Sequence, residues 1–151
     1  MTGARDVHPS RFPWPQQAAL VIGAVYLLIG LAGFVATRFD DFAEATGEHL
    51  LGFGVNPLHN VVHLLIGLAG MASSTRLRTS AVYGWALAVV YGLVFLFGLF
   101  AVGRPGINLL NLNWADNVLH LATAAIGVVV GLGAARLARA AGWTDPATPA
   151  G

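Results

Sequence analysis

The chain has 151 residues, of which 56% are hydrophobic and only 10% are charged, whereas a soluble domain carries about 25% charged residues. This composition argues against an ordinary soluble protein. The basic residues are all Arg, and the formal net charge is +1 at pH 7. Because these Arg are dispersed and nucleic-acid binding needs a concentrated basic face, no nucleic acid is expected as a partner. With no Cys in the sequence, any metal must use nitrogen and oxygen ligands.

Four apolar segments follow one another along the chain, at residues 18–36, 56–75, 81–102 and 113–135. A bilayer core of about 30 Å needs roughly 20 mostly apolar residues in a helix that rises about 1.5 Å per residue. The first and third segments are uninterrupted. The second and fourth begin with polar residues, so each can cross only if its polar opening turns lie at membrane depth. We therefore predict an all-α fold, a four-transmembrane-helix bundle that spans residues 18–135 and has the lipid bilayer around it.

The positions of the Arg residues predict the orientation of this bundle. Short cytoplasmic segments of membrane proteins hold the positive excess. One side carries six Arg, and the opposite side carries two (Arg5, Arg11, Arg76, Arg78, Arg136 and Arg139 against Arg38 and Arg104). We therefore expect residues 1–17 and the tail 136–151 in the cytoplasm, with Trp14 and Trp143 near the inner interface and Trp114 near the outer one. Residues 1–17 show no signal-peptide cleavage site, so the first span is expected to stay in the mature protein.

The second and fourth spans begin with similar sequences. NPLHNVVHL (residues 56–64) aligns without gaps with NWADNVLHL (residues 113–121), and five of the nine positions are identical at an offset of 57 residues. Tyr26 aligns with Tyr91 at an offset of 65, so the first external loop is the longer one by eight residues. This pattern predicts two tandem helix-hairpin repeats related by a pseudo-twofold axis along the membrane normal, with the second and fourth spans together at the axis. Both Tyr are expected near mid-membrane, where they can form hydrogen bonds across the bundle.

Two related motifs carry a resemblance to a known family. They are N-x-x-H-N-x-x-H at Asn56, His59, Asn60 and His63, and N-x-x-D-N-x-x-H at Asn113, Asp116, Asn117 and His120. The chain resembles, from about residue 18 to 135, a family of small bacterial, largely actinobacterial, four-span membrane proteins classed as a domain of unknown function. The resemblance implies the fold and a location in the bacterial cytoplasmic (inner) membrane. It implies no activity, so a mechanism must come from the residues.

The motif residues recur at positions i, i+3, i+4 and i+7 and therefore form one polar stripe on each helix. The two stripes can face each other at matching depth near the external surface. If each helix starts at its Asn, His59 and Asp116 lie about 4 to 5 Å along the axis, and His63 and His120 about 10 Å. Polar side chains inside a membrane are unfavourable unless they are paired, so these stripes should point into the bundle.

The leading hypothesis from these stripes is a transition-metal site. His59, His63, Asp116 and His120 make two i, i+4 chelating pairs, a donor set that suits Zn, Fe, Mn or Cu. The four motif Asn would lie around the ligands, where Asn60 and Asn117 can orient the imidazoles. The long first loop adds three further candidate ligands (Glu44, Glu48 and His49). The ion would serve redox chemistry, storage or transfer.

Three other interpretations stay open at this point. Haem b can be held between His63 and His120 as paired axial ligands, as in electron-carrying four-helix bundles. The polar residues can instead only fasten the two spans by interhelical hydrogen bonds, each worth about 0.6 kcal/mol in membranes. They can also line a path for protons or a substrate. A membrane-protein partner or a homo-oligomer is compatible with all of these, and His8 in the N-terminal segment is expected to be solvated.

Overall fold

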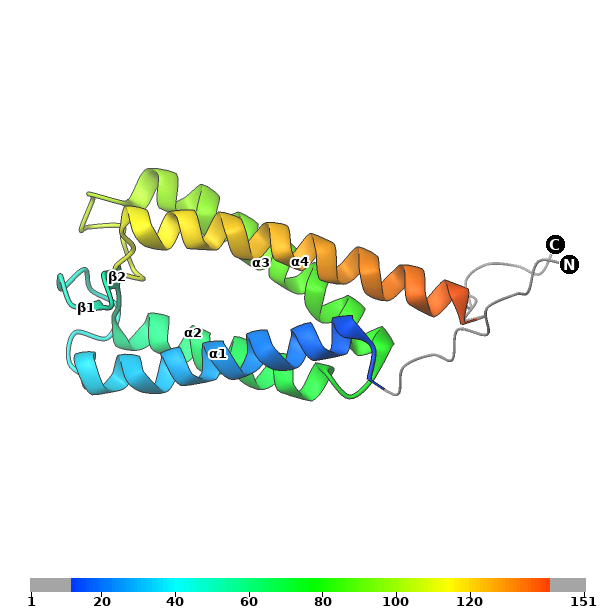
Figure 1. The fold of residues 1–151 in the computed structure, drawn as a ribbon. Helices are drawn as coiled ribbons and strands as arrows, with labels where there is room; N and C mark the ends of the chain where they lie inside the picture. Colours follow the sequence, from blue (N-terminus) through cyan, green and yellow to red (C-terminus); the bar gives the residue numbers. More distant parts are fainter. Residues whose placement is uncertain (1–11, 142–151) are drawn as a thin grey trace, which may run out of the picture.

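The computed structural model describes residues 12–141, and its four helices form two antiparallel pairs (Figure 1). Helix α1 (Trp14–Thr37) packs along α2 (Pro57–Ser73), and α3 (Leu77–Ala101) packs along α4 (Trp114–Ala140). The predicted all-α four-helix bundle is therefore confirmed. Helix α1 begins earlier than expected because proline is tolerated in a first turn, where its missing N–H has no intrahelical partner, and Pro13 and Pro15 flank Trp14.

Three of these helices are long and apolar enough to cross a membrane. They are α1, α3 and α4, with 24, 25 and 27 residues. The second predicted span is shorter than expected, because α2 has 17 residues and so extends only about 26 Å. The Ser74 hydroxyl donates to the carbonyl oxygen of Met71 at the end of α2. Large apolar side chains are exposed along the long helices, for example Leu28 and Leu93, as a lipid-facing surface requires. The chain is a membrane protein by these properties.

Glycines bring the two helices of each pair into backbone contact. A Cβ atom added at Gly23 of α1 would lie 2.6 Å from the amide nitrogen of Met71 in α2. In the other pair, a Cβ atom at Gly84 of α3 would lie 2.5 Å from the amide nitrogen of Gly131 in α4. Small residues at such crossings allow the close approach that drives helix association in membranes.

The second and fourth spans do not pack directly, which corrects the expectation that they meet at the axis. No Cα atom of α2 lies within 8 Å of one in α4. The physical reason is that the backbone-to-backbone contacts at glycines lie within the pairs, whereas aromatic side chains fill the space between the pairs. Tyr26 and Tyr91 belong to this central core, with ring centroids 5.3 Å apart. The two polar stripes therefore meet through their side chains.

A short β-hairpin that the sequence did not predict lies at one end of the bundle (Figure 1). This end, called the loop end, carries the α1–α2 and α3–α4 connections. Strand β1 (His49–Leu50) pairs antiparallel with β2 (Phe53–Gly54), so that His49 is opposite Gly54. The two residues between the strands, Leu51 and Gly52, have φ angles of 55° and 90°. Positive φ at both central positions is the geometry of the tight turn that matches strand twist. The hairpin belongs to the longer of the two loops at this end.

Asparagine amides tie the two loops at this end together. The Nδ2 atom of Asn111 donates to the carbonyl oxygens of Glu48 and Val55, at 3.1 and 2.9 Å. The Nδ2 atom of Asn56 donates to the carbonyl oxygens of Glu44 and Leu109. The first loop is therefore anchored over the ends of both helix pairs.

The start of α1 and the end of α4 lie at the opposite end of the bundle, beside the short α2–α3 connection (Figure 1). This arrangement agrees with a chain that enters and leaves on one side. Several residues used to predict the orientation and surroundings of the spans lie outside the described residues, namely Arg5, Arg11, Trp143 and His8.

Candidate metal centre

The helices α2 and α4 begin in the same way, and this fixes the depth of the site. The Oδ1 atom of Asn56 accepts a hydrogen bond from the amide nitrogen of His59 at 2.9 Å. The Oδ1 atom of Asn113 accepts one from the amide nitrogen of Asp116 at 3.0 Å. Asparagine is a preferred residue at this position because its side chain pairs an otherwise free N–H of the first turn. The motif Asn56 and Asn113 are thus helix caps.

Three histidines converge between the two helix pairs. One ring nitrogen each from His59, His63 and His120 lies within 4.8 Å of the others, a spacing that can hold a metal ion. The ring centroids of His59 and His63 are 4.3 Å apart, and those of His59 and His120 are 5.9 Å apart. All three side chains are buried, with exposed fractions of 2%, 6% and 2%. The structure therefore brings together the three imidazoles that the sequence predicted as ligands.

The hydrogen bonding of these imidazoles is incomplete. The Nδ1 atom of His59 lies 3.0 Å from the carbonyl oxygen of Gly54. A carbonyl can only accept, so this contact places the His59 proton on Nδ1, the arrangement usual for a metal-ligating histidine, and the ring also interacts with the backbone of Leu110. The Nδ1 atoms of His63 and His120 are buried without a partner. Buried polar atoms are normally paired, so these nitrogens indicate a place for a ligand.

Asp116 lies beside the histidines but is engaged elsewhere. Its Oδ2 atom accepts hydrogen bonds from the amide nitrogens of Gly54, at 2.8 Å, and Asn113, at 2.9 Å. Together with the Asn113 side chain it completes a capping box at the start of α4. The cluster of three imidazoles does not include this carboxylate. In the structure Asp116 ties the β-hairpin to α4.

The remaining two motif asparagines contact glycines rather than imidazoles. The side chain of Asn60 lies against Gly33, and its Nδ2 atom donates to the Thr37 hydroxyl at 2.9 Å. The side chain of Asn117 lies in the same way against Gly98, without a hydrogen-bond partner. A side chain added at Gly33 would overlap with the Asn60 amide, and one added at Gly98 would overlap with the Asn117 amide. Sequence reasoning did not find Thr37, which has no counterpart in the motif.

Two tyrosines complete the surroundings of the imidazoles. The ring of Tyr26 lies 5.2 Å from that of His63, and the ring of Tyr91 lies 5.3 Å from that of His120. The hydroxyl of Tyr26 shares a hydrogen bond of 2.8 Å with the Thr123 hydroxyl of α4, which confirms the expected bond across the bundle. The hydroxyl of Tyr91 is buried without a partner.

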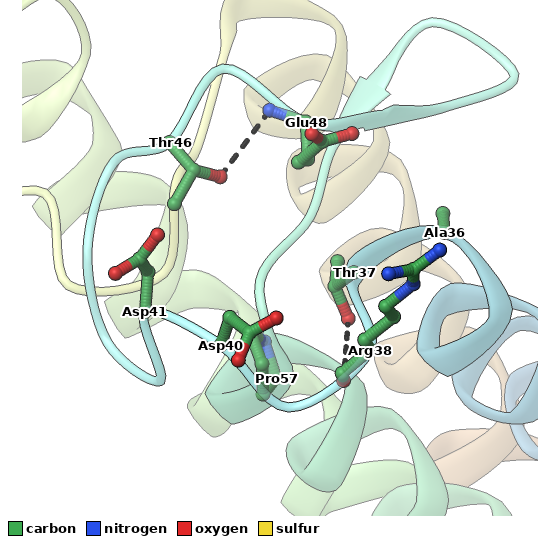
Figure 2. Close-up of a pocket in the computed structure, with 8 residues that line it drawn as sticks. All are labelled: Ala36, Thr37, Arg38, Asp40, Asp41, Thr46, Glu48 and Pro57. Atoms are coloured by element: carbon green, nitrogen blue, oxygen red, sulfur yellow. Dashed lines mark hydrogen bonds between the residues drawn. The ribbon is translucent and has the colours of Figure 1, made fainter.

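The three loop residues that were candidate ligands lie on the surface. Glu44, Glu48 and His49 are all exposed, and none of them belongs to the histidine cluster. Glu48 instead lines a separate polar pocket of about 440 Å³ (Figure 2). The acids Asp40 and Asp41 and the cation Arg38 line the same pocket. The acidic character of the loop is therefore concentrated beside the ends of α1 and α2.

A small cavity adjoins the histidine cluster beneath the hairpin. It has a volume of about 70 Å³ and is lined by His63, His120, Asp116, Ile29 and Leu119, and by four hairpin and loop residues (Leu50, Leu51, Phe53 and Val55). Most of this lining is apolar. The cavity thus offers a partly open space next to the imidazoles of His63 and His120.

The fold and the site define a class of protein, a helical membrane bundle that encloses a buried cluster of three imidazoles. Within that class, the chain belongs to the family described as a domain of unknown function (DUF4383), whose model matches residues 16–133. The matched stretch contains all three histidines and the two helix caps. Comparisons with curated proteins and with solved structures give no significant match.

Proposed function

We propose that the protein binds a transition-metal ion at His59, His63 and His120, for redox chemistry, storage or transfer. The observation that carries this proposal is the convergence of three buried imidazoles, two of which have unpaired nitrogens. Nitrogens that ligate one tetrahedral Zn²⁺ at 2.0–2.1 Å lie about 3.3–3.4 Å apart. The present separation of up to 4.8 Å requires the rings to move closer by side-chain rotation when an ion binds.

The donor set favours some of the expected metals over others. Imidazole suits Zn, Cu and Fe, whereas Mn is better matched by carboxylate and water ligands. Three protein ligands also leave a coordination position open, as in catalytic zinc sites. Asp116 lines the adjoining cavity, and its negative charge would offset part of the ion's charge in a site of low dielectric.

A purely fastening role is less well supported. Polar residues fasten membrane helices by forming interhelical hydrogen bonds. The described residues include no hydrogen-bond partner for Nδ1 of His63 or of His120. Burial of unpaired polar atoms destabilises the apo protein. An ion that pairs them would remove this penalty.

The cavity does not fit haem. A volume of about 70 Å³ is far below the roughly 300–1,000 Å³ of pockets that hold cofactors. The ring of His59 also lies 4.3 Å from that of His63, where a porphyrin plane would have to pass. We accordingly expect the purified protein to lack a Soret absorption band. The presence of such a band would show that the site binds haem instead of a metal ion.

Metal analysis of the purified protein tests the proposal directly. After loading with Zn²⁺, Cu²⁺ or Fe²⁺ and removal of unbound ion, the wild-type chain should retain a stoichiometric ion. His63→Ala and His120→Ala should lose it. His49→Ala is the matched control, because this exposed histidine lies outside the cluster and its replacement should leave the metal content unchanged. The proposal fails if the wild type retains no stoichiometric ion, or if His49→Ala loses as much as His63→Ala.

A second readout is the free energy of unfolding. An ion that binds only the folded chain should raise it by about 2.7 kcal/mol at a free concentration of 100 times Kd. The free energies of unfolding of His63→Ala and His120→Ala should not change when the ion is added. A wild-type protein whose stability is also unaffected by all three ions would contradict the proposal independently of the elemental analysis.

We further propose that the bundle lies in a bacterial cytoplasmic membrane with both termini in the cytoplasm. Within the described residues, four Arg lie at the end where α4 finishes and two at the loop end (Arg76, Arg78, Arg136 and Arg139 against Arg38 and Arg104). This distribution supports the orientation. A C-terminal reporter that functions only in the cytoplasm should be active, and a C-terminal reporter active only outside the cytoplasm would overturn the orientation.

The two hairpins are, in our proposal, tandem repeats around the site. The support is that two contacts occur in both: a glycine against an Asn amide and a Tyr ring beside an imidazole (Gly33–Asn60 and Tyr26–His63, Gly98–Asn117 and Tyr91–His120). Equivalent positions of the two repeats should contribute similarly to the affinity for the ion. His63→Ala and His120→Ala are therefore expected to weaken metal binding by similar factors, and a large difference between them would argue against functional equivalence.

A further inference from the structure

Two neighbouring cavities open between α1 and α4. The smaller one, of about 70 Å³, lies beneath the hairpin and is lined in part by His63 and His120. The larger one, of about 200 Å³, is lined almost entirely by apolar side chains of the two helices, including Val21 and Ile126. Ile29 and Leu119 line both cavities, so the two are adjacent. We call the two cavities together the α1–α4 fissure.

The α1–α4 fissure faces the lipid side of the bundle. Val21 and Val25 line it and are 60% and 47% exposed, on a helix that is long enough to span a membrane. The backbone-to-backbone contacts at glycines lie within the α1–α2 and α3–α4 pairs, whereas α1 and α4 meet through the Trp14 side chain against Gly133 and a hydrogen bond between Tyr26 and Thr123. A molecule dissolved in the bilayer can thus approach the histidine cluster between these two helices.

We propose that the fissure is a lateral entrance for a single-chain lipid whose head is one uncharged oxygen function, of the class of a long-chain alcohol. The chain would lie in the larger cavity, and the head oxygen would reach His63 and His120 in the smaller one. The assignment of this lipid as a ligand of the metal centre rests on the proposed function, because the head oxygen would take the open coordination position of the ion. The entrance itself does not depend on the ion.

The size of the smaller cavity restricts the head of this ligand. A space of 10–15 Å³ on this scale holds about one water molecule. The 70 Å³ beside the histidines therefore accommodates only about five to seven groups of that size, which is enough for a hydroxyl-bearing chain end but not for a phospholipid headgroup.

The charge and polarity of the site restrict it further. The carboxylate of Asp116 lines the cavity and disfavours an anionic head such as that of a fatty acid. The unpaired Nδ1 atoms of His63 and His120 are buried polar groups that an uncharged oxygen can pair by hydrogen bonding when no ion occupies them. The apolar walls of the larger cavity favour a hydrocarbon chain over a hydrated solute.

Photolabelling with a defined probe tests the entrance. The probe is a 16-carbon primary alcohol with a photoreactive diazirine in mid-chain, added to the full chain in lipid nanodiscs. Labels should concentrate on residues 21–29 of α1 and 119–126 of α4. Unlabelled hexadecanol should compete about fivefold better than hexadecane, as one net hydrogen bond would give. Labels spread evenly over the exposed faces of all helices would overturn the proposal, and equal competition by palmitate would overturn the proposed head.

Two variants separate this proposal from metal binding. Leu119→Trp should fill the fissure and remove the labelling without removing a histidine, and Ile29→Phe is a second, smaller obstruction. Leu93→Trp is the matched control, because Leu93 is exposed on α3 and lines neither cavity. Unchanged labelling in both fissure variants would refute the entrance. Metal content is measured on the same samples: wild type that binds metal but is not labelled refutes only the entrance, and wild type that is labelled without metal refutes only the metal centre.

Discussion

Replacement of Asp116 by Ala should destabilise the protein by about 2–4 kcal/mol. The Oδ2 atom of Asp116 accepts from the buried amide of Gly54 at 2.8 Å and from the partly buried amide of Asn113 at 2.9 Å. A buried donor left without its acceptor costs about 1–3 kcal/mol, and the less buried donor belongs at the lower end of that range. Asp116→Asn keeps the shape and an amide oxygen. It should cost only about 1 kcal/mol, because charge-assisted hydrogen bonds are roughly twice as strong as neutral ones.

The assay is reversible unfolding in mixed detergent micelles, followed by Trp fluorescence, with metal content measured on the same preparations. If Asp116 acts as a structural tie, Asp116→Asn should keep the ion and most of the stability. A loss below about 0.5 kcal/mol in Asp116→Ala would refute the hydrogen-bond reasoning. An Asp116→Asn protein that is as stable as wild type but has lost its ion would show instead that the carboxylate is a ligand.

Four further substitutions test the packing. Gly23→Ala should destabilise the protein by about 1–3 kcal/mol, because the added Cβ would lie 2.6 Å from a backbone nitrogen of α2. Gly92→Ala, in open space on α3, should stabilise it by up to about 1 kcal/mol. Equal effects of the two substitutions in thermal unfolding would contradict this reasoning. Tyr26→Phe removes the bond to Thr123 and should cost about 0.6 kcal/mol in the same assay, and a loss above 2 kcal/mol would reveal a further role. Gly54→Ala would drive a Cβ into a loop carbonyl and should reduce protection of the hairpin amides from hydrogen exchange; unchanged protection would contradict the crowding.

The long helices could be predicted because membrane spans leave a direct compositional signal. Uninterrupted apolar runs mark α1 and α3, and their interiors agree with the structure. The β-hairpin could not be predicted in the same way. Its turn consists of Leu51 and Gly52, and Leu is not a residue that favours positive φ, so the usual turn signal is weak. The hairpin is held by contacts distant in sequence, such as that from Gly54 to Asp116, 62 residues away.

The site was partly predictable from helical spacing. Positions i and i+4 place His59 and His63 on one face, and the repeat of the motif adds His120 at the same depth. The role of Asp116 was harder to foresee, although a signal for it exists. Asn followed by an acid three residues later is a variant of the capping-box pattern, and Asn113 and Asp116 have that spacing. Read in this way, the motif combines two helix starts with three imidazoles.

Gly54 belongs to neither of the helices that carry the histidines, yet both are anchored to it. Its amide nitrogen donates to Asp116 of α4, and its carbonyl oxygen accepts from His59 of α2, so one residue bridges two helices whose Cα atoms stay more than 8 Å apart. A displacement of the His59 ring therefore pulls on the same residue that holds the first turn of α4. The hairpin is thus coupled to the cavity beneath it both by its own lining residues and by the two hydrogen bonds of Gly54.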